Sequence, residues 1–227
     1  MALNIVSEID GRVPVRNVLM SVSDKTGLDT FAGGLVAACP DVKILSTGGT
    51  YTFLQKTLGD ALCARHLVSV SGYTGQPEMQ GGLVKTLDFK IYLGLLSETY
   101  NAAHQTDLAR TQAVAIDMAV VNLYPFAQAV AAPGATPESA RTNIDIGGPC
   151  MVRASAKNYL RVASVTDPAD YAALLDELRA NSGSLGLGTR LALMKKAFAH
   201  TAAYDTAIAA FFAPVTPDSV NGIYTIR

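Results

Sequence analysis

Residues 44–56, ILSTGGTYTFLQK, carry the pattern on which the fold prediction rests. Ile44 and Leu45 are typical of the end of a buried strand, and residues 51–58 can continue as a helix. The turn between them consists of five small polar residues: Ser46, Thr47, Gly48, Gly49 and Thr50. A strand that passes through a short turn into a helix is the basic unit of an α/β protein. The turn is then either a phosphate cradle or only a tight connection.

The same alternation of apolar runs and amphipathic segments continues along the chain. Strands are predicted at residues 17–22, 42–47, 66–70, 89–96, 116–124 and 161–166. A helix is predicted at Leu28–Ala38, between the first two of these strands. Strands that are apolar through their whole length and separated by helices indicate a parallel sheet that is covered on both faces. We therefore predict an α/β fold with a parallel β-sheet flanked by helices.

The pattern becomes helical after Asp167 and Pro168. Helices are predicted at 169–180 and 190–212, with a linker, SGSLGLG, at 182–188 and an edge strand at the end of the turn-rich tail. The LGLGTR run imitates a dinucleotide-binding motif, but it follows no predicted strand and lacks the third glycine. The expected organisation is a leader (1–15), an α/β core (16–167), and a helical extension and tail that packs on the core (168–227).

Composition narrows the class of protein. The chain has 227 residues, of which 49% are hydrophobic and 16% charged, and its net charge is −1. This profile is typical of a well-packed globular protein and argues against a nucleic-acid-binding surface. Three widely spaced cysteines argue against a disulfide framework or a zinc site. The start, MALNIVSEIDGRVP, lacks the apolar run of a signal peptide, and no run approaches the roughly 20 apolar residues that span a bilayer. We predict a soluble, cytoplasmic protein that contacts no membrane.

Three polar turns follow predicted strands: SVSDKTG at 21–27, STGGT at 46–50 and NLYPF at 122–126. In an open parallel sheet, ligands bind beyond the carboxyl ends of the strands, so these turns are expected to meet in one crevice. Two glycines and a following helix N-terminus suit an anion, and Lys25 adds a cation. Neither SVSDKTG nor STGGT has the nucleotide P-loop pattern, so one phosphate monoester is the predicted ligand. The alternative for Ser23 and Asp24 is an ordinary helix cap.

Other polar residues are candidates for chemistry, and each has a structural alternative. Lys85 stands beside Thr86, and a lone lysine is usually solvated. Asn122 and Tyr124 lie at a predicted strand end, where a tyrosine can simply be buried. Asp145 precedes the GGP run that predicts a helix start, and Arg153 and Lys157 follow on one helical face. The histidines show no ligand spacing, and His200 is interpreted as a packing residue of its helix.

Nine motifs occur in the order and spacing of one family: SVSDKTGL, LSTGGT, PEM, VKTL, VVNLYPF, NIDIGGP, RASAKN, TDPADY and KAFAHTAAYD. Over residues 16–212 the chain resembles the N-terminal IMP cyclohydrolase domain of the bifunctional purine-biosynthesis enzyme that also carries AICAR formyltransferase. The resemblance implies a methylglyoxal-synthase-like fold with a helical C-terminal extension. It implies closure of the ribotide FAICAR to IMP, with loss of water.

The resemblance also implies roles for individual residues. The 5′-phosphate would be held by Ser21, Ser23, Lys25, Ser46, Thr47, Gly48, Gly49 and Thr50. The catalytic positions would be Lys85, Tyr124, Asp145 and Lys157, and the other substrate contacts Thr86, Asn122, Ile146 and Gly147. No metal or organic cofactor is implied. The expected partners are the small-molecule ribotide, a second copy in a homodimer, and a separate formyltransferase that supplies FAICAR.

The reaction fits these residue types. The carboxamide nitrogen of FAICAR is a poor nucleophile, so holding it against the formyl carbon supplies much of the acceleration. Lys85 would stabilise negative charge on the formyl oxygen, and Tyr124, Asp145 and Lys157 would share the proton transfers. Which of them is acid and which is base stays open. A straight helix would separate the Cα atoms of Asp145 and Lys157 by ~18 Å, so a shared role requires a looped or broken segment.

One segment departs from the family pattern DGRVKTLHPKIHGG, because the chain has GGLVKTLDFKIYLG there. Leu83 replaces an arginine expected near the substrate, and Asp88, Phe89, Tyr92 and Leu93 replace His, Pro, His and Gly. A second hypothesis is therefore a ribotide-binding module without activity. A third, a methylglyoxal synthase, is disfavoured by the extra segment beyond residue 125 and by the NIDIGGP motif.

Overall fold

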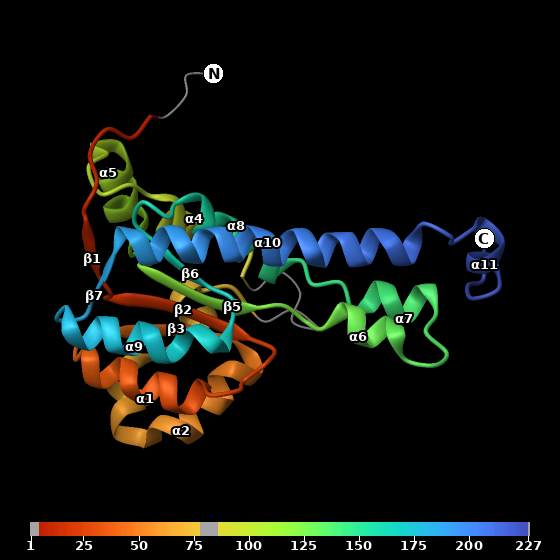
Figure 1. Ribbon diagram of the computed structural model, residues 1–227, viewed down its shortest axis with the longest axis horizontal. Coiled ribbons are helices and arrows are strands. Elements are labelled where there is room, and N and C mark those ends of the chain that lie inside the picture. The colour runs from red at the N-terminus through yellow and green to blue at the C-terminus, as the bar shows by residue number, and fades with distance from the viewer. Residues whose placement is uncertain (1–4, 78–85, 227) are drawn as a thin grey trace.

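The computed structural model describes residues 5–77 and 86–226. Its centre is a five-stranded parallel sheet with the strand order β4-β3-β2-β5-β6 (Figure 1). The strands are β2 (Asn17–Val22), β3 (Lys43–Ser46), β4 (Leu67–Ser69), β5 (Met118–Asn122) and β6 (Ala163–Val165). Each lies within a predicted strand range, and the predicted parallel sheet is confirmed.

Helices cover both faces of this sheet (Figure 1). One face carries α1 (Leu28–Ala38), α2 (Gly48–His66) and α9 (Tyr171–Ala180), and the other carries α4 (Phe89–Leu96), α8 (Gly147–Lys157) and α10 (Leu187–Phe212). Along β2, Val18 and Met20 pack into the first core and Leu19 into the second. A strand buried on both faces is apolar at successive positions, which explains the continuous apolar runs of the sequence.

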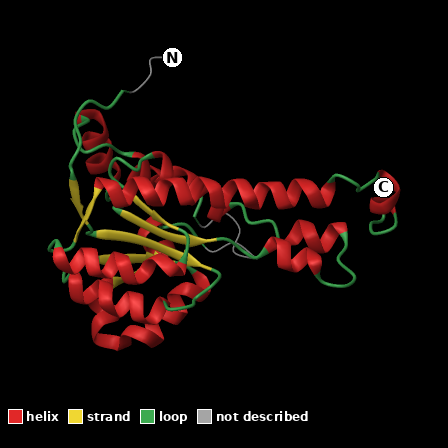
Figure 2. Cartoon of the chain, in the orientation of Figure 1, coloured by secondary structure: helices red, strands yellow, loops and turns green. Residues whose placement is uncertain are grey.

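Shorter elements complete the chain (Figure 2). They are the helices α3 (Val70–Thr74), α5 (Ala102–Thr111), α6 (Phe126–Ala131), α7 (Pro137–Thr142) and α11 (Pro217–Asn221), and a 3₁₀ turn at Pro168–Asp170. A second, antiparallel sheet pairs β1 (Arg12–Pro14) with β7 (Ser184–Gly186). α2 is interrupted at Gly59, whose φ of 71° breaks the helix.

The strand predicted at residues 89–96 is wrong, because this segment is helix α4. The side chain of Asp88 accepts a hydrogen bond from the backbone N–H of Lys90 at 2.8 Å and caps the helix. Ile91 and Leu95, one helical turn apart, are both buried, whereas Phe89 is 60% exposed. The alternation of apolar residues resembled a strand, but the helical spacing of the two buried residues is the one that matches the core.

Two predictions near the C-terminus are also wrong. The predicted linker contains β7, and the adjacent Arg190 is buried, with its guanidinium donating hydrogen bonds to the carbonyls of Leu185 and Asp10. These bonds fix the start of α10 against β1 and β7. The tail forms helix α11 and has no strand among its described residues, because Thr216 and Ser219 form a capping box that starts a helix.

The long helix α10 connects the sheet with the outer part of the molecule. It packs on α8 and β6, and its C-terminal half projects beyond the sheet beside α6 (Figure 1). Its buried residues include Leu193, Ala197 and Tyr204. None of the helices in the described part of the chain is long and apolar enough to cross a membrane.

The two edges of the sheet differ in chemistry. At the amino edge, the buried Asp117 accepts hydrogen bonds from the backbone N–H groups of Arg16 and Asn17 and pairs with Arg161 at 3.2 Å. At the carboxyl edge, the chain runs from β2 to β3 and β4 on one side and from β5 to β6 on the other. This reversal between β2 and β5 is the switch point where open α/β sheets bind their ligands.

Candidate functional site

A cleft of about 470 Å³ opens at this switch point. Thirteen of the sixteen predicted site residues line it: Ser21, Ser23, Lys25, Thr47, Gly48, Gly49, Thr50, Thr86, Asn122, Tyr124, Asp145, Ile146 and Gly147. They come from the ends of β2, β3 and β5, from the residue before α4, and from the start of α8. The predicted convergence of the polar turns therefore holds in the structure.

The turn after β3 is bound to the end of β2 by side-chain hydrogen bonds. The hydroxyl of Thr50 accepts from the backbone N–H of Val22 at 3.0 Å and donates to its carbonyl at 3.1 Å. The hydroxyls of Ser21 and Thr47 lie 3.3 Å apart. Because these bonds join residues about one strand–helix–strand unit apart in sequence, the two turns form one wall of the cleft.

This wall is suited to an anion. Helix α2 begins at Gly48, and the residue before it, Thr47, is the N-cap. The side chain of Thr47 makes no capping hydrogen bond, so the first backbone N–H groups of α2, which lie at the cleft, have no capping side chain. Gly48 has φ 49°, a left-handed conformation that glycine adopts without strain. The ammonium of Lys25 lies 3.4 Å from the carbonyls of Val22 and Ser23, at the same wall.

Asn122 holds the loop after β2 in place. Its side-chain oxygen accepts hydrogen bonds from the backbone N–H groups of Ser23 at 2.7 Å and Asp24 at 2.9 Å. Its side-chain nitrogen donates to the carbonyl of Asp24 at 2.9 Å. Asn122 lines the cleft, as the substrate-contact prediction requires, but both ends of its amide already bind this loop.

The opposite wall is built around Asp145. Its carboxylate accepts a hydrogen bond from the backbone N–H of Gly148 at 2.9 Å, which caps the start of α8. Burial raises the pKa of Asp145, and hydrogen bonds from the backbone N–H groups of Gly148 and Tyr124 partly oppose this rise. Such a carboxyl group is poised for proton transfer, because its protonated and ionised forms lie closer in free energy at neutral pH than in a solvated aspartate.

The two glycines before Pro149 allow this close packing. A Cβ atom added to Gly148 would lie 2.3 Å from the carboxylate oxygen Oδ2 of Asp145. A Cβ atom added to Gly147 would lie 2.5 Å from the hydroxyl of Thr86. The GGP run is therefore needed for the geometry of the cleft as well as for starting the helix.

Tyr124 and Ile146 form the rim of the cleft. Their exposed fractions are 58% and 60%, although both belong to residue types that usually pack inside. Thr86 lies deeper and is 7% exposed. An exposed aromatic ring next to a half-buried carboxyl group is a suitable arrangement for covering a planar ring of a ligand.

Comparisons with known proteins identify the family of the chain. Residues 27–150 match the MGS-like domain, and residues 155–226 match the AICARFT/IMPCHase bienzyme. The chain is 46% identical over 210 residues, 92% of its length, to the bifunctional purine biosynthesis protein PurH of Magnetococcus marinus. The chain belongs to the AICARFT/IMPCHase family. It spans 38% of the length of the Magnetococcus protein.

A solved structure of the same fold supports the assignment. The chain superposes on the crystal structure of ForH with a TM-score of 0.72 and 30% sequence identity. The match covers 87% of this chain and 99% of ForH. Because 87% of this chain is covered, the likeness extends beyond the MGS-like domain at residues 27–150.

Two of the predicted site residues that the structure describes do not line the cleft. Ser46 is fully buried, and its hydroxyl donates to the carbonyl of Met20 at 2.8 Å, so it connects β3 with β2 behind the turn. Lys157 is exposed at the far end of α8, a continuous helix from Gly147, and the looped or broken segment required for a shared role with Asp145 is absent. The structure therefore does not support the grouping of Lys157 with Asp145 in one site. Lys85 and the arginine replacement Leu83 lie outside the described residues.

Some residues of the cleft were not predicted as site residues. They are Val22, Leu87, Thr142, Ile144, Gly148 and Met151. Gly148 was available from the sequence, because an aspartate three residues before a helical N–H is a capping pattern. Met151 follows it by three residues on the same helical face. Thr142 and Ile144 carry no such local pattern; they lie at the end of α7 and in the segment that connects it to α8.

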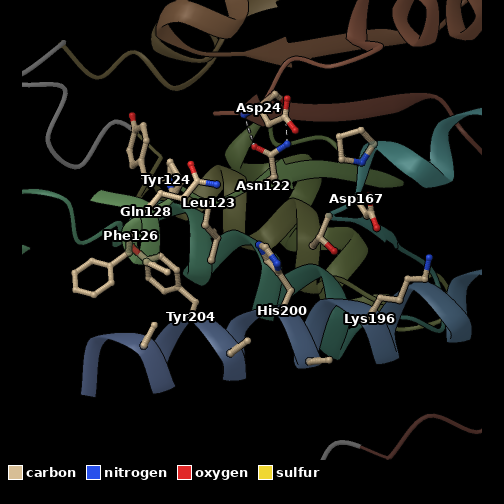
Figure 3. A pocket seen from close by; sticks show the side chains of 17 residues that line it. Asp24, Asn122, Leu123, Tyr124, Phe126, Gln128, Asp167, Lys196, His200 and Tyr204 are labelled. Carbon is tan, nitrogen blue, oxygen red and sulfur yellow. Dashed lines mark hydrogen bonds between the residues drawn. The ribbon is translucent and has the colours of Figure 1, made fainter. Parts of the chain in front are cut away.

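A second cavity of about 680 Å³ lies on the other side of Asn122 and Tyr124, against α10 (Figure 3). His200 points into it from α10, and its Nε2 is buried without a hydrogen-bond partner among the described residues. Burial lowers the pKa of His200. Although this cavity is larger, three of the six residues that α10 contributes to it are alanines, so the smaller cleft with its two polar walls is the candidate active site.

Proposed function

We propose that this chain is an IMP cyclohydrolase that closes FAICAR to IMP with loss of water. The observation that carries the proposal is the pairing of a wall suited to an anion with a half-buried carboxyl group across one cleft. The family relationship supports it, since the printed name of the Magnetococcus relative concerns purine biosynthesis. FAICAR has one phosphate at one end and the two groups that react at the other, which matches the two walls.

The size of the cleft fits one ribotide. Its volume of about 470 Å³ falls within the range of pockets that enclose a small ligand. We place the 5′-phosphate against Lys25 and the first N–H groups of α2. The imidazole ring then extends toward Tyr124 and Asp145. This orientation puts the charged group of the substrate at the cationic wall and the reacting groups at the wall that can exchange protons.

The cleft residues then account for the steps of the reaction. The carboxamide nitrogen forms a bond to the formyl carbon and loses one proton. The formamide nitrogen loses a second proton as it forms a double bond to that carbon, and the former formyl oxygen takes up both protons and leaves as water. Fixing the two substituents in a reactive arrangement contributes most when both ends of the substrate are held. Asp145 and Tyr124 are the described residues placed to transfer protons. The oxyanion-stabilising role of Lys85 remains part of the proposal from the family resemblance.

The direct test is FAICAR conversion by the purified chain, followed by ultraviolet absorbance and by identification of IMP as product. We expect enzymatic turnover that is linear in protein concentration and is strongly reduced in Asp145→Asn. The alternative, a ribotide-binding module, would bind IMP tightly but convert FAICAR no faster than buffer does. That result would contradict the proposed enzyme function. Dihydroxyacetone phosphate serves as the control substrate, and we expect no methylglyoxal from it.

A further inference from the structure

Tyr204 of α10 reaches the loop that carries Asp145. Its hydroxyl oxygen accepts a hydrogen bond from the backbone N–H of Asp145 at 2.7 Å. The same hydroxyl lies 3.4 Å from the carbonyl of Asn143, to which it donates. Tyr204 is 8% exposed, so these bonds are shielded from solvent. The contact joins residues 59 positions apart, on different elements.

The ring of Tyr204 is itself held in place. It meets the ring of Phe126 edge-to-face, with the centroids 6.1 Å apart and an interplanar angle of 69°. Figure 3 shows the two rings next to each other at the base of the second cavity. Phe126 is 1% exposed and follows Tyr124 by two residues. Both the hydroxyl and the ring therefore have defined neighbours, and neither depends on solvent.

We propose that Tyr204 is a positioning residue for Asp145, fixing its backbone so that its carboxyl group faces the reacting end of the substrate. This inference rests on the proposed cyclohydrolase function. Tyr204 does not line the cleft and does not touch the substrate, so it acts only through Asp145 and its loop.

The carboxylate of Asp145 and its backbone are therefore held separately, the carboxylate by the backbone N–H groups of Gly148 and Tyr124 and the backbone by Tyr204. The N–H of Gly148 holds the carboxylate at 2.9 Å, and the hydroxyl of Tyr204 holds the backbone N–H at 2.7 Å. Without the hydroxyl of Tyr204, the carboxylate of Asp145 stays bound to the start of α8, but the backbone of Asp145 can shift. A misplacement of about 1 Å in a catalytic group can reduce the rate by about 10²-fold. Substrate binding at the phosphate wall involves none of these contacts.

The test is the Tyr204→Phe variant, which keeps the ring and removes only the oxygen. The matched control is Tyr73→Phe, because the hydroxyl of Tyr73 accepts a hydrogen bond from the backbone N–H of Val114 at 2.8 Å, away from the cleft. We expect Tyr204→Phe to lower kcat about tenfold or more, while the KM for FAICAR changes less than about twofold. Tyr73→Phe should leave both constants near wild type, with a comparable change in Tm.

A double-mutant cycle with Asp145→Asn separates positioning from general stability. If Tyr204 acts through Asp145, Tyr204→Phe should cost little further in kcat once Asp145 is replaced. Equal fold-losses in both backgrounds, or an unchanged kcat in the single variant, would overturn the inference while leaving the proposed function intact. No turnover by the wild-type chain would overturn both, so the two failures are distinguishable in one assay.

Discussion

The two walls of the cleft are built in different ways. The anion-binding wall consists of turns that directly follow β2 and β3, tied together by Thr50 and by Asn122. The wall with Asp145 lies in a loop before α8, and it depends on Tyr204 from the C-terminal helix. The first wall is therefore a local product of the sheet edge. The second needs a contact made by the last long helix of the chain, which suggests that binding and chemistry can be perturbed separately.

The largest effect is expected for Asp145→Asn, which removes the proton-transferring group but keeps its shape. We expect kcat to fall by about 10²–10⁴-fold, the usual contribution of a positioned acid or base, with little change in KM. Steady-state FAICAR kinetics measure it. Asp41→Asn, at an exposed aspartate on the surface, is the control and should retain wild-type rates. A rise in KM with an unchanged kcat would assign Asp145 to substrate binding, and the two walls would then not differ in function.

The opposite effect is expected for Lys25→Met at the other wall. A charge-assisted hydrogen bond to phosphate contributes about 1.5–3 kcal/mol, or roughly 10–100-fold in affinity. We expect the KM for FAICAR and the Kd of IMP to rise by this factor, with kcat nearly unchanged. Lys43→Met removes the same charge from the start of β3, where the ammonium binds the carbonyl of Arg65, and should leave both constants unaltered. An unchanged Kd for Lys25→Met would place the phosphate elsewhere.

Gly148→Ala should affect both stability and chemistry. The added methyl group would lie 2.3 Å from Oδ2 of Asp145 and 2.7 Å from Cδ2 of Leu123. Relieving such overpacking costs about 1–3 kcal/mol of unfolding free energy and displaces the carboxylate, so kcat should fall as well. Denaturant unfolding and FAICAR kinetics report the two effects. Gly33→Ala, where nothing lies within 4 Å inside α1, should instead be neutral or stabilising.

The smallest effect concerns pH and stability. Burial raises the pKa of Asp145 in the folded protein above its value in the unfolded chain. Its contribution to stability is therefore fully present below the unfolded pKa, near 3.9, and is lost as the pH rises through the folded pKa. We expect wild type to lose stability relative to Asp145→Asn as the pH rises from the unfolded pKa through the folded one. Urea unfolding at several pH values measures this, and a constant difference would show that the carboxyl group is not perturbed.

Much of the sheet and the anion-binding wall could be predicted from the sequence, for a physical reason. Buried parallel strands leave continuous apolar runs, and polar turns after them must lie at the same edge. The glycines and the helix start that suit the STGGT turn to an anion can be read from the sequence. The hydrogen bonds that join this turn to the end of β2 cannot. Asn122 was also predicted at the cleft, but its hydrogen bonds to residues 23 and 24 depend on the pairing of β2 with β5. No local pattern shows such a pairing.

The errors arose where distant contacts decide the structure. Residues 89–96 alternate like a strand, yet the cap from Asp88 and the buried face of Ile91 and Leu95 make them a helix. The family resemblance groups Lys157 with Asp145, but Lys157 lies at the C-terminal end of the continuous helix α8. The role of Tyr204 was not visible, because its partner lies 59 residues earlier and the contact exists only after α10 has packed.

The most direct test of the two-walled cleft is a crystal structure of the protein with IMP bound. The account predicts the phosphate within hydrogen-bond distance of Lys25 and of the backbone N–H groups at the start of α2. It also predicts the purine ring between Tyr124 and Asp145. A phosphate beside Asp145, or IMP in the second cavity beside His200, would contradict the assignment of binding and chemistry to the two walls.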